Sequence, residues 1–358
     1  MSPPSKPMQA LFPWAKPPFI CNAPMAGVAG PELAAEVSTA GGIGFLGCAI
    51  DVSPGSAELS GLEQKLREVR RLLGPDAVSG NNVLPVGVGF LTCHASIRHF
   101  SETALPVVAR CRPAAVWLFA PDEELKPHRD IVSALRKLDP RPVIFVQIGN
   151  VVAAREAAED GADVVVCQGI DAGGHQFRRG SGVAALVPEV CRMLAQEFAE
   201  KSIAVFAAGG IAEGRGVAAM LALGADGIVM GTRFATSSES MYAAERKRLI
   251  LSTQDGGRST LKSPFNDAVT KSTLWGPSYD GRAIVGPIQE AYLSGTSLED
   301  CQERVEADVK AGVSPPQVCT WASAAVGLIT REQAAAEIVR EVGAEALDTI
   351  SRLASSLT

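Results

Sequence analysis

The sequence predicts an α/β fold, namely a (β/α)8 TIM barrel with a smaller, partly helical cap inserted after strand eight. Eight short apolar runs alternate with helical patterns between residues 19 and 232, as expected for repeated βα units. The runs are continuously apolar, which is typical of parallel strands covered on both faces. An open doubly wound sheet is the competing architecture, but no Gly-x-Gly-x-x-Gly motif follows the first run, which disfavours it.

The elements follow one another along the chain with short connections. The predicted strands cover residues 19–25, 43–47, 86–91, 115–120, 143–148, 164–166, 204–210 and 226–232. The predicted helices between them include residues 31–39, 59–73, 151–159, 187–198 and 216–223. Within residues 59–73, Leu62, Leu66, Val69 and Leu73 recur at helical spacing between charged residues. In such a barrel the chemistry lies at the carboxyl ends of the strands, so the residues that follow each run are the functional candidates.

The composition changes after Phe234. Residues 236–245 and 253–271 are polar and contain no strong strand pattern, whereas helical patterns return at 288–293 and 298–312. We therefore predict three segments along the chain. They are a barrel over residues 1–234, a cap over 235–316, and a segment over 317–358 that returns to the barrel mouth and ends in an outer amphipathic helix.

The bulk composition is that of an ordinary soluble protein. The chain has 358 residues, 47% of them hydrophobic and 20% charged, with a formal net charge of −6. This charge, without a basic stripe, argues against a nucleic-acid partner, and no window is long and apolar enough to span a membrane. The eight cysteines lack Cys-x-x-Cys spacing and the proline-rich N-terminus is not a secretory signal, so we predict a cytoplasmic protein with reduced thiols. A homodimer is compatible with these features.

The ends of predicted strands seven and eight carry the pattern of a phosphate site. Ala208 is followed by Gly209 and Gly210, and Val229-Met230 is followed by Gly231 and Thr232. The loops after strands seven and eight of such barrels commonly bind a phosphate through backbone N–H groups and a short helix N-terminus. The alternative is that these glycines only turn each strand into the next helix.

Two further strand ends are candidates for a ligand site. Predicted strand six leads through Gly169, Gly173 and Gly174 to His175, where glycines permit close backbone approach and an imidazole can exchange protons near neutral pH. A tight turn with a surface histidine is the alternative. Residues 23–27, Ala-Pro-Met-Ala-Gly, follow strand one and leave the backbone uncluttered for a flat ring. Alone, they are better explained as an ordinary turn.

Together these motifs resemble the nitronate monooxygenases, formerly called 2-nitropropane dioxygenases. The resemblance rests on Asn-Ala-Pro-Met-Ala-Gly at 22–27, Gly-Ile-Asp-Ala-Gly-Gly-His at 169–175, Ala-Ala-Gly-Gly-Ile at 207–211, and the stretches 224–234 and 321–329. Their order spans nearly the whole chain, and the loop around residues 180–190 is most similar to fungal members. Related flavin-dependent enoyl-ACP reductases and quinone reductases share the pattern.

The resemblance implies a non-covalent FMN and oxidation of alkyl nitronates by O₂ to a carbonyl compound and nitrite. It implies that His175 is the catalytic base, which deprotonates neutral nitroalkanes. The cofactor-binding residues that it implies are Ala23, Pro24, Met25, Ala26, Gly27, Gly89, Gln147, Gln168, Gly173, Gly174, Ala208, Gly209, Gly210, Val229, Met230, Gly231 and Thr232. FMN would supply the redox chemistry while the protein orients it.

Some positions depart from the family pattern and leave alternatives open. Gly89 stands where members often have asparagine, and Gln168 where many have glutamate. Asp171 could orient His175 or be a turn acid, and the other histidines form no metal-binding pattern. The competing functions are an NAD(P)H-dependent FMN reductase of enoyl thioesters or quinones, and a non-enzymatic barrel that binds a phosphorylated ligand.

Overall fold

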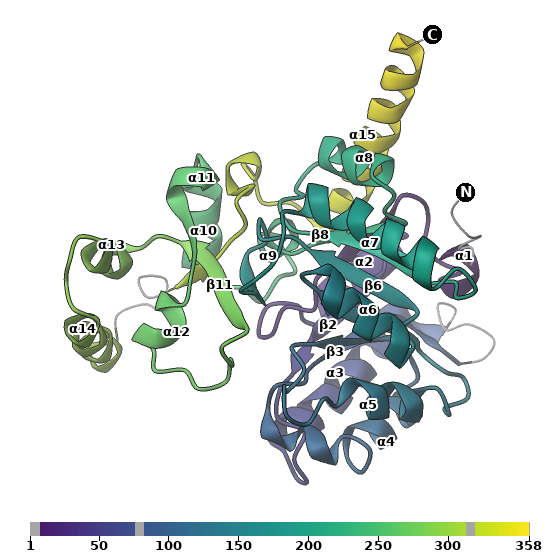
Figure 1. The fold of residues 1–358 in the computed structure, drawn as a ribbon, viewed down its shortest axis with the longest axis horizontal. Helices are drawn as coiled ribbons and strands as arrows, with labels where there is room; N and C mark the ends of the chain where they lie inside the picture. Colours follow the sequence, from purple (N-terminus) through teal and green to yellow (C-terminus); the bar gives the residue numbers. More distant parts are fainter. Residues whose placement is uncertain (1–7, 76–81, 313–318, 358) are drawn as a thin grey trace.

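Eight parallel strands form the central sheet of the protein in a computed structural model, which describes residues 8–75, 82–312 and 319–357 (Figure 1). The sheet order is β1-β9-β8-β6-β5-β4-β3-β2. The strands are β1 (Phe19–Asn22), β2 (Gly44–Ala49), β3 (Leu84–Leu91), β4 (Pro113–Phe119), β5 (Val143–Ile148), β6 (Val164–Gln168), β8 (Ala204–Ala208) and β9 (Gly227–Met230). The predicted strands seven and eight are therefore β8 and β9.

Contacts between β1 and β2 close this sheet into a barrel. Cys21 and Ile43 form an isolated parallel bridge. Beside it, the Asn22 side-chain amide donates to the Phe45 carbonyl oxygen and accepts from the Phe45 N–H, both at 2.8 Å. The buried side chain of Asn22 thus replaces ladder bonds at the seam. The closed arrangement confirms the predicted (β/α)8 barrel.

Helices cover the outside of the barrel, so the strands are buried on both faces (Figure 1). On β4, Val116 and Leu118 pack towards the helices, whereas Trp117 packs in the barrel interior. The interior is filled by aromatic rings: the Phe145 ring centroid lies 5.2 Å from that of Phe45 and 5.7 Å from that of Trp117. The outer helices are α2 (Pro31–Thr39), α3 (Ala57–Leu73), α4 (Ala104–Cys111), α5 (His128–Leu135), α6 (Val151–Asp160), α7 (Val183–Glu197), α8 (Gly214–Ala222) and α15 (Ala335–Ser356).

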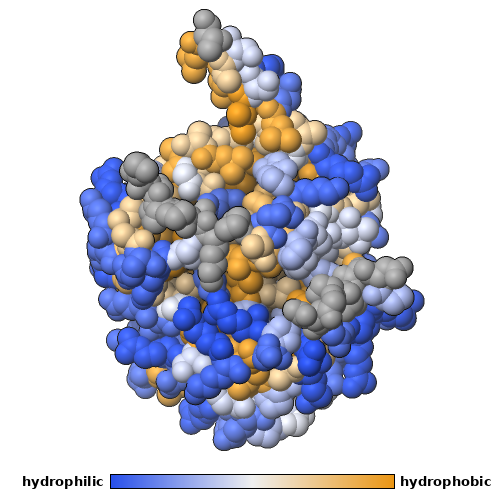
Figure 2. Space-filling view, turned by 90° about the vertical axis from the view of Figure 1, so that its right-hand side faces the viewer, coloured by the Kyte–Doolittle hydropathy of each residue, from blue (hydrophilic) through white to orange (hydrophobic). Residues whose placement is uncertain are grey.

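The two chain ends have different roles in this architecture. Helix α1 (Met8–Leu11) and Phe12 pack beneath the aromatic core, with the Phe12 ring centroid 5.9 Å from that of Phe145. They cover the amino ends of the strands and leave the carboxyl ends for the site. The end of α15 projects from the body, with Leu347, Ile350 and Leu353 exposed (Figure 2). Among the described residues, no helix has both the length and the apolar character needed to cross a membrane.

A second, antiparallel sheet lies beside the barrel mouth. Its strands are β10 (Thr260–Ser263), β11 (Tyr279–Ile284), β12 (Thr320–Trp321) and β7 (Gly174–Phe177), which pairs with β11. The elements of the chain after β9 are α9 (Thr232–Ala235), α10 (Ala244–Ser252), α11 (Gly256–Ser259), α12 (Phe265–Val269), α13 (Pro287–Leu293), α14 (Leu298–Lys310) and η4 (Val326–Leu328), whereas η2 (Ala95–His99) follows β3 on the barrel.

This small sheet was not expected from the sequence. The helical patterns at 288–293 and 298–312 correspond to α13 and α14, whereas α10, α11 and α12 were not predicted. Strands β10 and β11 lie in segments without a strand pattern, because polar residues and Gly281 interrupt them. His175, expected in a glycine-rich loop, lies on β7. The proposed segment boundary at 234/235 stays a prediction, and that at 316/317 lies outside the described residues.

Candidate active site

The carboxyl ends of five neighbouring strands bring most of the sequence-predicted site residues together. In the sheet, β1, β9, β8, β6 and β5 are consecutive. The Ala23 N–H donates to the Met230 carbonyl oxygen at 3.0 Å, and the Gly169 N–H donates to that of Ala208 at 2.9 Å. Residues 23–27, 208–210 and 229–232 therefore form one continuous rim. Gln147 and Gln168 face the same opening from β5 and β6.

Bare backbone forms the β8 and β9 part of this rim. Gly209 and Gly210 have φ values of +102° and +71°, and within the described part of the chain neither donates a backbone hydrogen bond. Side chains could not replace these hydrogens, because a Cβ on Gly209 would lie 2.9 Å from the Gly169 carbonyl oxygen. Unpaired amides held in this shape fit an anionic group such as a phosphate.

The N-termini of α8 and α9 lie next to this rim, and they differ in the hydrogen bonds that they already make. At the N-terminus of α8, the Gly214 N–H donates to the Glu345 carboxylate at 2.7 Å, so this amide is already paired. After β9, Gly231 leads into the single turn α9, and the Thr232 hydroxyl accepts from the Ser323 N–H at 3.0 Å. Among the described residues, the backbone amides on the β8 side that donate to no protein partner therefore include those of Gly209 and Gly210 in the glycine turn.

The β1 loop faces the same opening from the other side. Ala26 and Gly27 are exposed, and Gly27 has a φ of +69°, with no atom within 4 Å of the place that a Cβ would occupy. Such a surface leaves room for a flat ring. Gly89 differs, because it is buried and a Cβ there would lie 2.4 Å from the Cys48 Sγ and 2.9 Å from the Pro24 Cβ. It packs behind the β1 loop.

A chain of buried amides connects the barrel core to His175. The Trp117 Nε1–H donates to the Gln147 Oε1 at 3.0 Å, and the Gln147 Nε2–H donates to the Gln168 Oε1 at 2.7 Å. The Gln168 Nε2–H then donates to the His175 carbonyl oxygen at 3.1 Å. An ionised glutamate could not make this last donation, so glutamine at position 168 suits a backbone carbonyl placed there.

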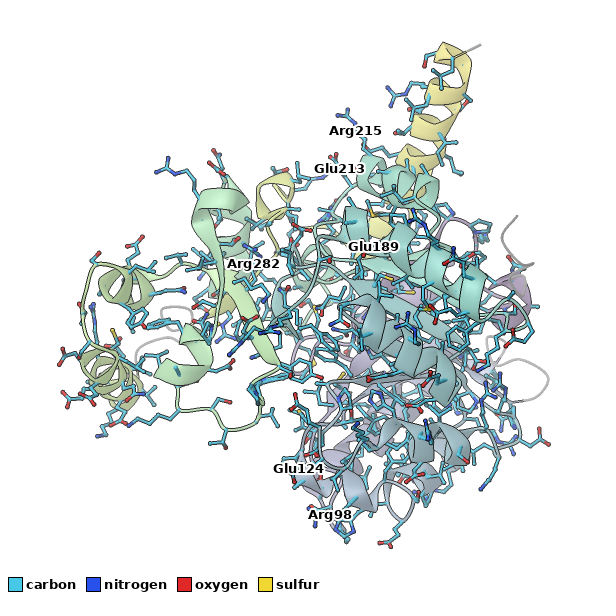
Figure 3. All side chains as sticks on the ribbon, viewed as in Figure 1. Arg98, Glu124, Glu189, Glu213, Arg215 and Arg282 are labelled. Atoms are coloured by element: carbon cyan, nitrogen blue, oxygen red, sulfur yellow. The ribbon has the colours of Figure 1, made fainter. Side chains whose placement is uncertain are left out.

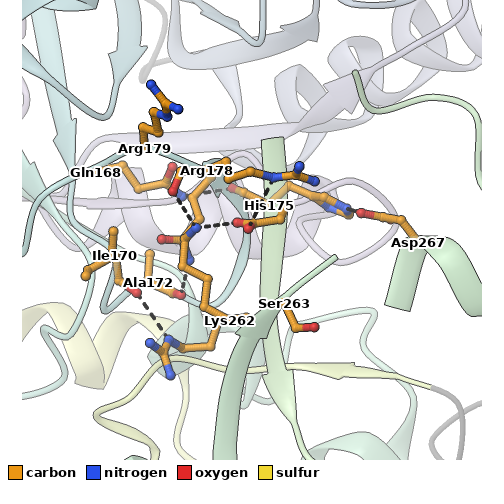
Figure 4. A network of polar contacts seen from close by, with 12 residues as sticks. Gln168, Ile170, Ala172, His175, Arg178, Arg179, Lys262, Ser263 and Asp267 are labelled. Carbon is orange, nitrogen blue, oxygen red and sulfur yellow. Dashed lines mark hydrogen bonds and ion pairs between the residues drawn. The ribbon is translucent and has the colours of Figure 1, made fainter. Parts of the chain in front are cut away.

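Figure 4 shows the imidazole of His175 next to the carboxylate of Asp267. Its Nε2 lies 2.9 Å and 3.1 Å from the two carboxylate oxygens of Asp267. The Trp275 ring stacks on it, with 3.8 Å between centroids and 12° between planes, and the Trp321 ring centroid lies 4.6 Å away. The side chains of His175 and Asp267 are only 12% and 18% exposed, so solvent screens this pair weakly.

Arg282 and Lys262 come from the small sheet and secure the backbone around His175. Arg282, labelled in Figure 3, donates to the carbonyl oxygen of Ile170 at 3.2 Å. Lys262 pairs with the buried Asp280 and donates to the carbonyl oxygen of Arg178. Burial lowers the pKa of the Arg282 guanidinium, although the carboxylates of Asp171 and Asp280 oppose this. These contacts tie β7 to β11 and so fix the direction in which His175 points.

Sequence reasoning missed the aspartate that contacts His175. Asp171, the nearby candidate, does not contact the imidazole; its carboxylate accepts from the Val183 N–H at 3.3 Å, so the turn-acid interpretation is the correct one. Asp267 is 92 residues from His175 in the sequence. The only sequence signal was a tryptophan, Trp275, in an otherwise polar segment.

Two cysteines and one further histidine lie in or near the barrel wall, and their surroundings fit a structural role. Cys167 is fully buried, which raises the pKa of its thiol, and burial raises the pKa of the Cys93 thiol to about 11. His128 is buried, its Nε2 lies 2.8 Å from the Thr92 hydroxyl, and burial lowers its pKa to about 4. Among the described residues, no group of three or more His, Cys, Asp or Glu side chains could hold a metal ion.

A cavity of about 850 Å³ opens between α5 and α6 next to the mouth. It is lined by Gln147, Phe177 and Tyr279, but neither His175 nor the glycine rim contributes to it. Its rim carries both carboxylates and guanidinium groups, such as Glu156 and Arg179, so its charge selects no single class of ligand. The chemistry-bearing groups gather instead at the strand ends of β6, β8, β9 and β1.

The fold and these groups define a (β/α)8 barrel whose mouth carries glycines with unpaired backbone amides and a histidine paired with an aspartate. A model of the nitronate monooxygenase family matches residues 107–345. A nitronate monooxygenase of Neurospora crassa is 41% identical over 97% of this chain and 93% of its own length, and one of Metarhizium robertsii is 34% identical over 97% and 96%. The chain belongs to the nitronate monooxygenase family, a family of flavin-dependent oxidoreductases.

Solved structures share the fold over nearly the whole chain. FabK from Thermotoga maritima has a TM-score of 0.72 at 24% identity and covers 98% of both chains. A nitroalkane oxidase from Streptomyces ansochromogenes has a TM-score of 0.69 at 24% identity, over 97% of this chain and all of that one. At these identities the similarity concerns the architecture alone.

Proposed function

We infer that the protein binds FMN at the barrel mouth and oxidises alkyl nitronates with O₂, giving a carbonyl compound and nitrite. The observation that carries this function is the ordered imidazole of His175 beside a glycine rim with unpaired amides, in a chain that belongs to this family. The bound flavin would supply the electron-transfer chemistry that no side chain offers.

The chain's own residues would bind and orient the flavin. Gly209, Gly210 and Gly231 present backbone amides suited to its phosphate, and residues 23–27 present the uncluttered surface suited to its ring. Gln147 and Gln168 come from β5 and β6, on the other side of β8 from β1, and are fixed by the amide chain that begins at Trp117. Gln147, Gln168 and Met230 are buried at the strand ends, and electrostatic interactions are stronger where water is excluded.

His175 would take the α-proton from a neutral nitroalkane. The electron pair of the broken C–H bond passes into the nitro group, so the substrate becomes the nitronate anion and the imidazole becomes an imidazolium. A positioned base of this kind typically contributes about 10²–10⁴-fold to the rate. A nitronate supplied as such needs no base, and the step is then bypassed.

A visible spectrum followed by two additions tests the proposal. The purified protein should be yellow, and nitrite should appear when a nitroalkane or a nitronate is added in air. The flavin should not be bleached by NADH or NADPH under anaerobic conditions. Bleaching would favour the reductase alternative, and a colourless protein that takes up no FMN would favour the non-enzymatic one. Absence of nitrite at every alkyl chain length would refute the proposed reaction.

A further inference from the structure

We propose that Asp267 is a positioning residue that keeps the proton of neutral His175 on Nε2, so that Nδ1 is the atom that accepts the substrate proton. The inference rests on the proposed function and adds to it a named atom and a named partner. The hydrogen bonds of the Asp267 carboxylate described above go to His175, and none goes to residues 23–27, 208–210 or 229–232. Asp267 would therefore act through the imidazole.

The hydrogen-bond geometry determines which nitrogen is protonated. Both carboxylate oxygens of Asp267 lie within hydrogen-bonding distance of the His175 Nε2, at 2.9 Å and 3.1 Å. An ionised carboxylate only accepts hydrogen bonds, so Nε2 must carry the hydrogen. A neutral imidazole has one N–H, and its lone pair is therefore on Nδ1. Within the described part of the chain, no hydrogen bond reaches Nδ1.

Packing on the His175 imidazole restricts its rotation. Trp275 stacks on one face at 3.8 Å between centroids, and Trp321 lies against it at 4.6 Å. The backbone of His175 pairs with Gly281 in the β7–β11 ladder and accepts from Gln168. A base held in one orientation avoids the loss of about 10²-fold that a 1 Å misplacement can cause.

Asp267 itself is fixed by the helices around it. It lies on α12, whose Phe265 and Val269 are buried against α13 and α14. The Gln302 Nε2–H donates to the Ala268 carbonyl oxygen at 2.9 Å, and the Ser272 N–H donates to the Asp267 carbonyl oxygen at 2.9 Å. The carboxylate is thus presented to the imidazole by a packed element and not by a loose loop.

The pair also suits the charge that forms in the reaction. When the α-proton moves to Nδ1, the imidazole carries both N–H groups and a positive charge, while the nitronate carries the negative charge. The ionised carboxylate next to Nε2 stabilises this imidazolium. Because the pair is mostly shielded from water, the stabilisation is weakly screened.

The alternative is that Asp267 only ties α12 to β7, and kinetics can separate the two roles. In Asp267→Asn, we expect kcat for a neutral nitroalkane to fall about 10²-fold, with KM, flavin content and turnover of preformed nitronate changed little. Asp267→Glu should recover part of the lost kcat. A matched control is Glu306→Gln, which removes the ion pair with Lys271 at 2.7 Å in the same region and should leave both activities unchanged. Equal losses on nitroalkane and nitronate, or no loss, would overturn the positioning role.

Nitrogen NMR tests the tautomer without relying on turnover. The chain has four histidines, so ¹⁵N-histidine labelling of the flavin-loaded protein gives few signals, and His175→Asn assigns the one of interest. Above the pH at which this signal stops titrating, we expect a protonated Nε2 and an unprotonated Nδ1. A proton on Nδ1 would refute the inference even if the protein turned over no nitro compound. Conversely, a protein without nitrite production but with the expected tautomer would refute only the proposed function.

Discussion

The two sides of the barrel mouth are built in different ways. On the β1, β9 and β8 side, the surface is backbone: glycines with positive φ and unpaired amides at consecutive strand ends. On the β7 side, the surface is side chains: His175 is held by Asp267 and Trp275 from one segment and by Trp321 from another. The backbone side depends on the conformation of each short loop that follows a strand. The side-chain side depends on groups that come together from distant parts of the sequence.

The largest effect on the barrel side should come from the seam between β1 and β2. Asn22→Ala leaves the N–H and carbonyl groups of Phe45 unpaired in the core, and each buried unpaired group costs about 1–3 kcal/mol. We expect the free energy of unfolding to fall by about 2–6 kcal/mol in denaturant titrations. Asn150→Ala, which removes the N-cap of α6, should cost about 1 kcal/mol. Equal losses in the two variants would contradict the seam's role.

The stability of the protein should depend on pH through the buried imidazole of His128. His128 is buried in the barrel wall, and burial lowers its pKa to about 4, against about 6.5 in the unfolded chain. The unfolded state therefore binds more protons between these values, and stability should fall by about 3 kcal/mol as the pH drops from 7 to 4. His128→Gln should flatten this part of the curve in urea unfolding. An unchanged slope in the variant would assign the loss to other groups.

Adding one methyl group at Gly209 should weaken FMN binding. Gly209→Ala places a Cβ 2.9 Å from the Gly169 carbonyl oxygen at a φ of +102°, and strain of this kind costs about 1–3 kcal/mol. We expect the Kd for FMN, measured by fluorescence titration, to rise about tenfold or more. Gly295→Ala is the control, because φ there is +105° but no atom lies within 4 Å. If both variants bind FMN alike, the rim does not hold the flavin.

The smallest of these effects should be seen at the stacked indole. Trp275→Ala removes the ring that lies parallel to the imidazole at 3.8 Å, and the attraction between an aromatic face and a cation is about 0.5–2 kcal/mol. We expect kcat for a neutral nitroalkane to fall between twofold and about thirtyfold, with flavin retained. Trp14→Ala, at the opposite end of the barrel, should not change this rate. A loss of flavin in Trp275→Ala would contradict the claim that the side-chain side orients His175 without binding the flavin.

This division also explains what the sequence could predict. The barrel strands are continuous apolar runs. Gly209 and Gly210 follow β8 directly and Gly231 follows β9, so strands and glycines are both visible in a short window of sequence. Asp267 and the pairing of β7 with β11 join residues far apart in the chain, and no local pattern encodes them. Strand β11 contains Asp280, Gly281 and Arg282, so it lacks the periodicity by which strands are found.

The central claim is that His175 is the base at the barrel mouth. Its most direct test is the ratio of nitroalkane turnover to turnover of the same compound supplied as its nitronate, measured for the wild-type protein and for His175→Asn with FMN bound. We expect the variant to lose about 10²–10⁴-fold on the nitroalkane and much less on the nitronate, so that the ratio collapses. A ratio that stays the same in the two proteins would contradict the account.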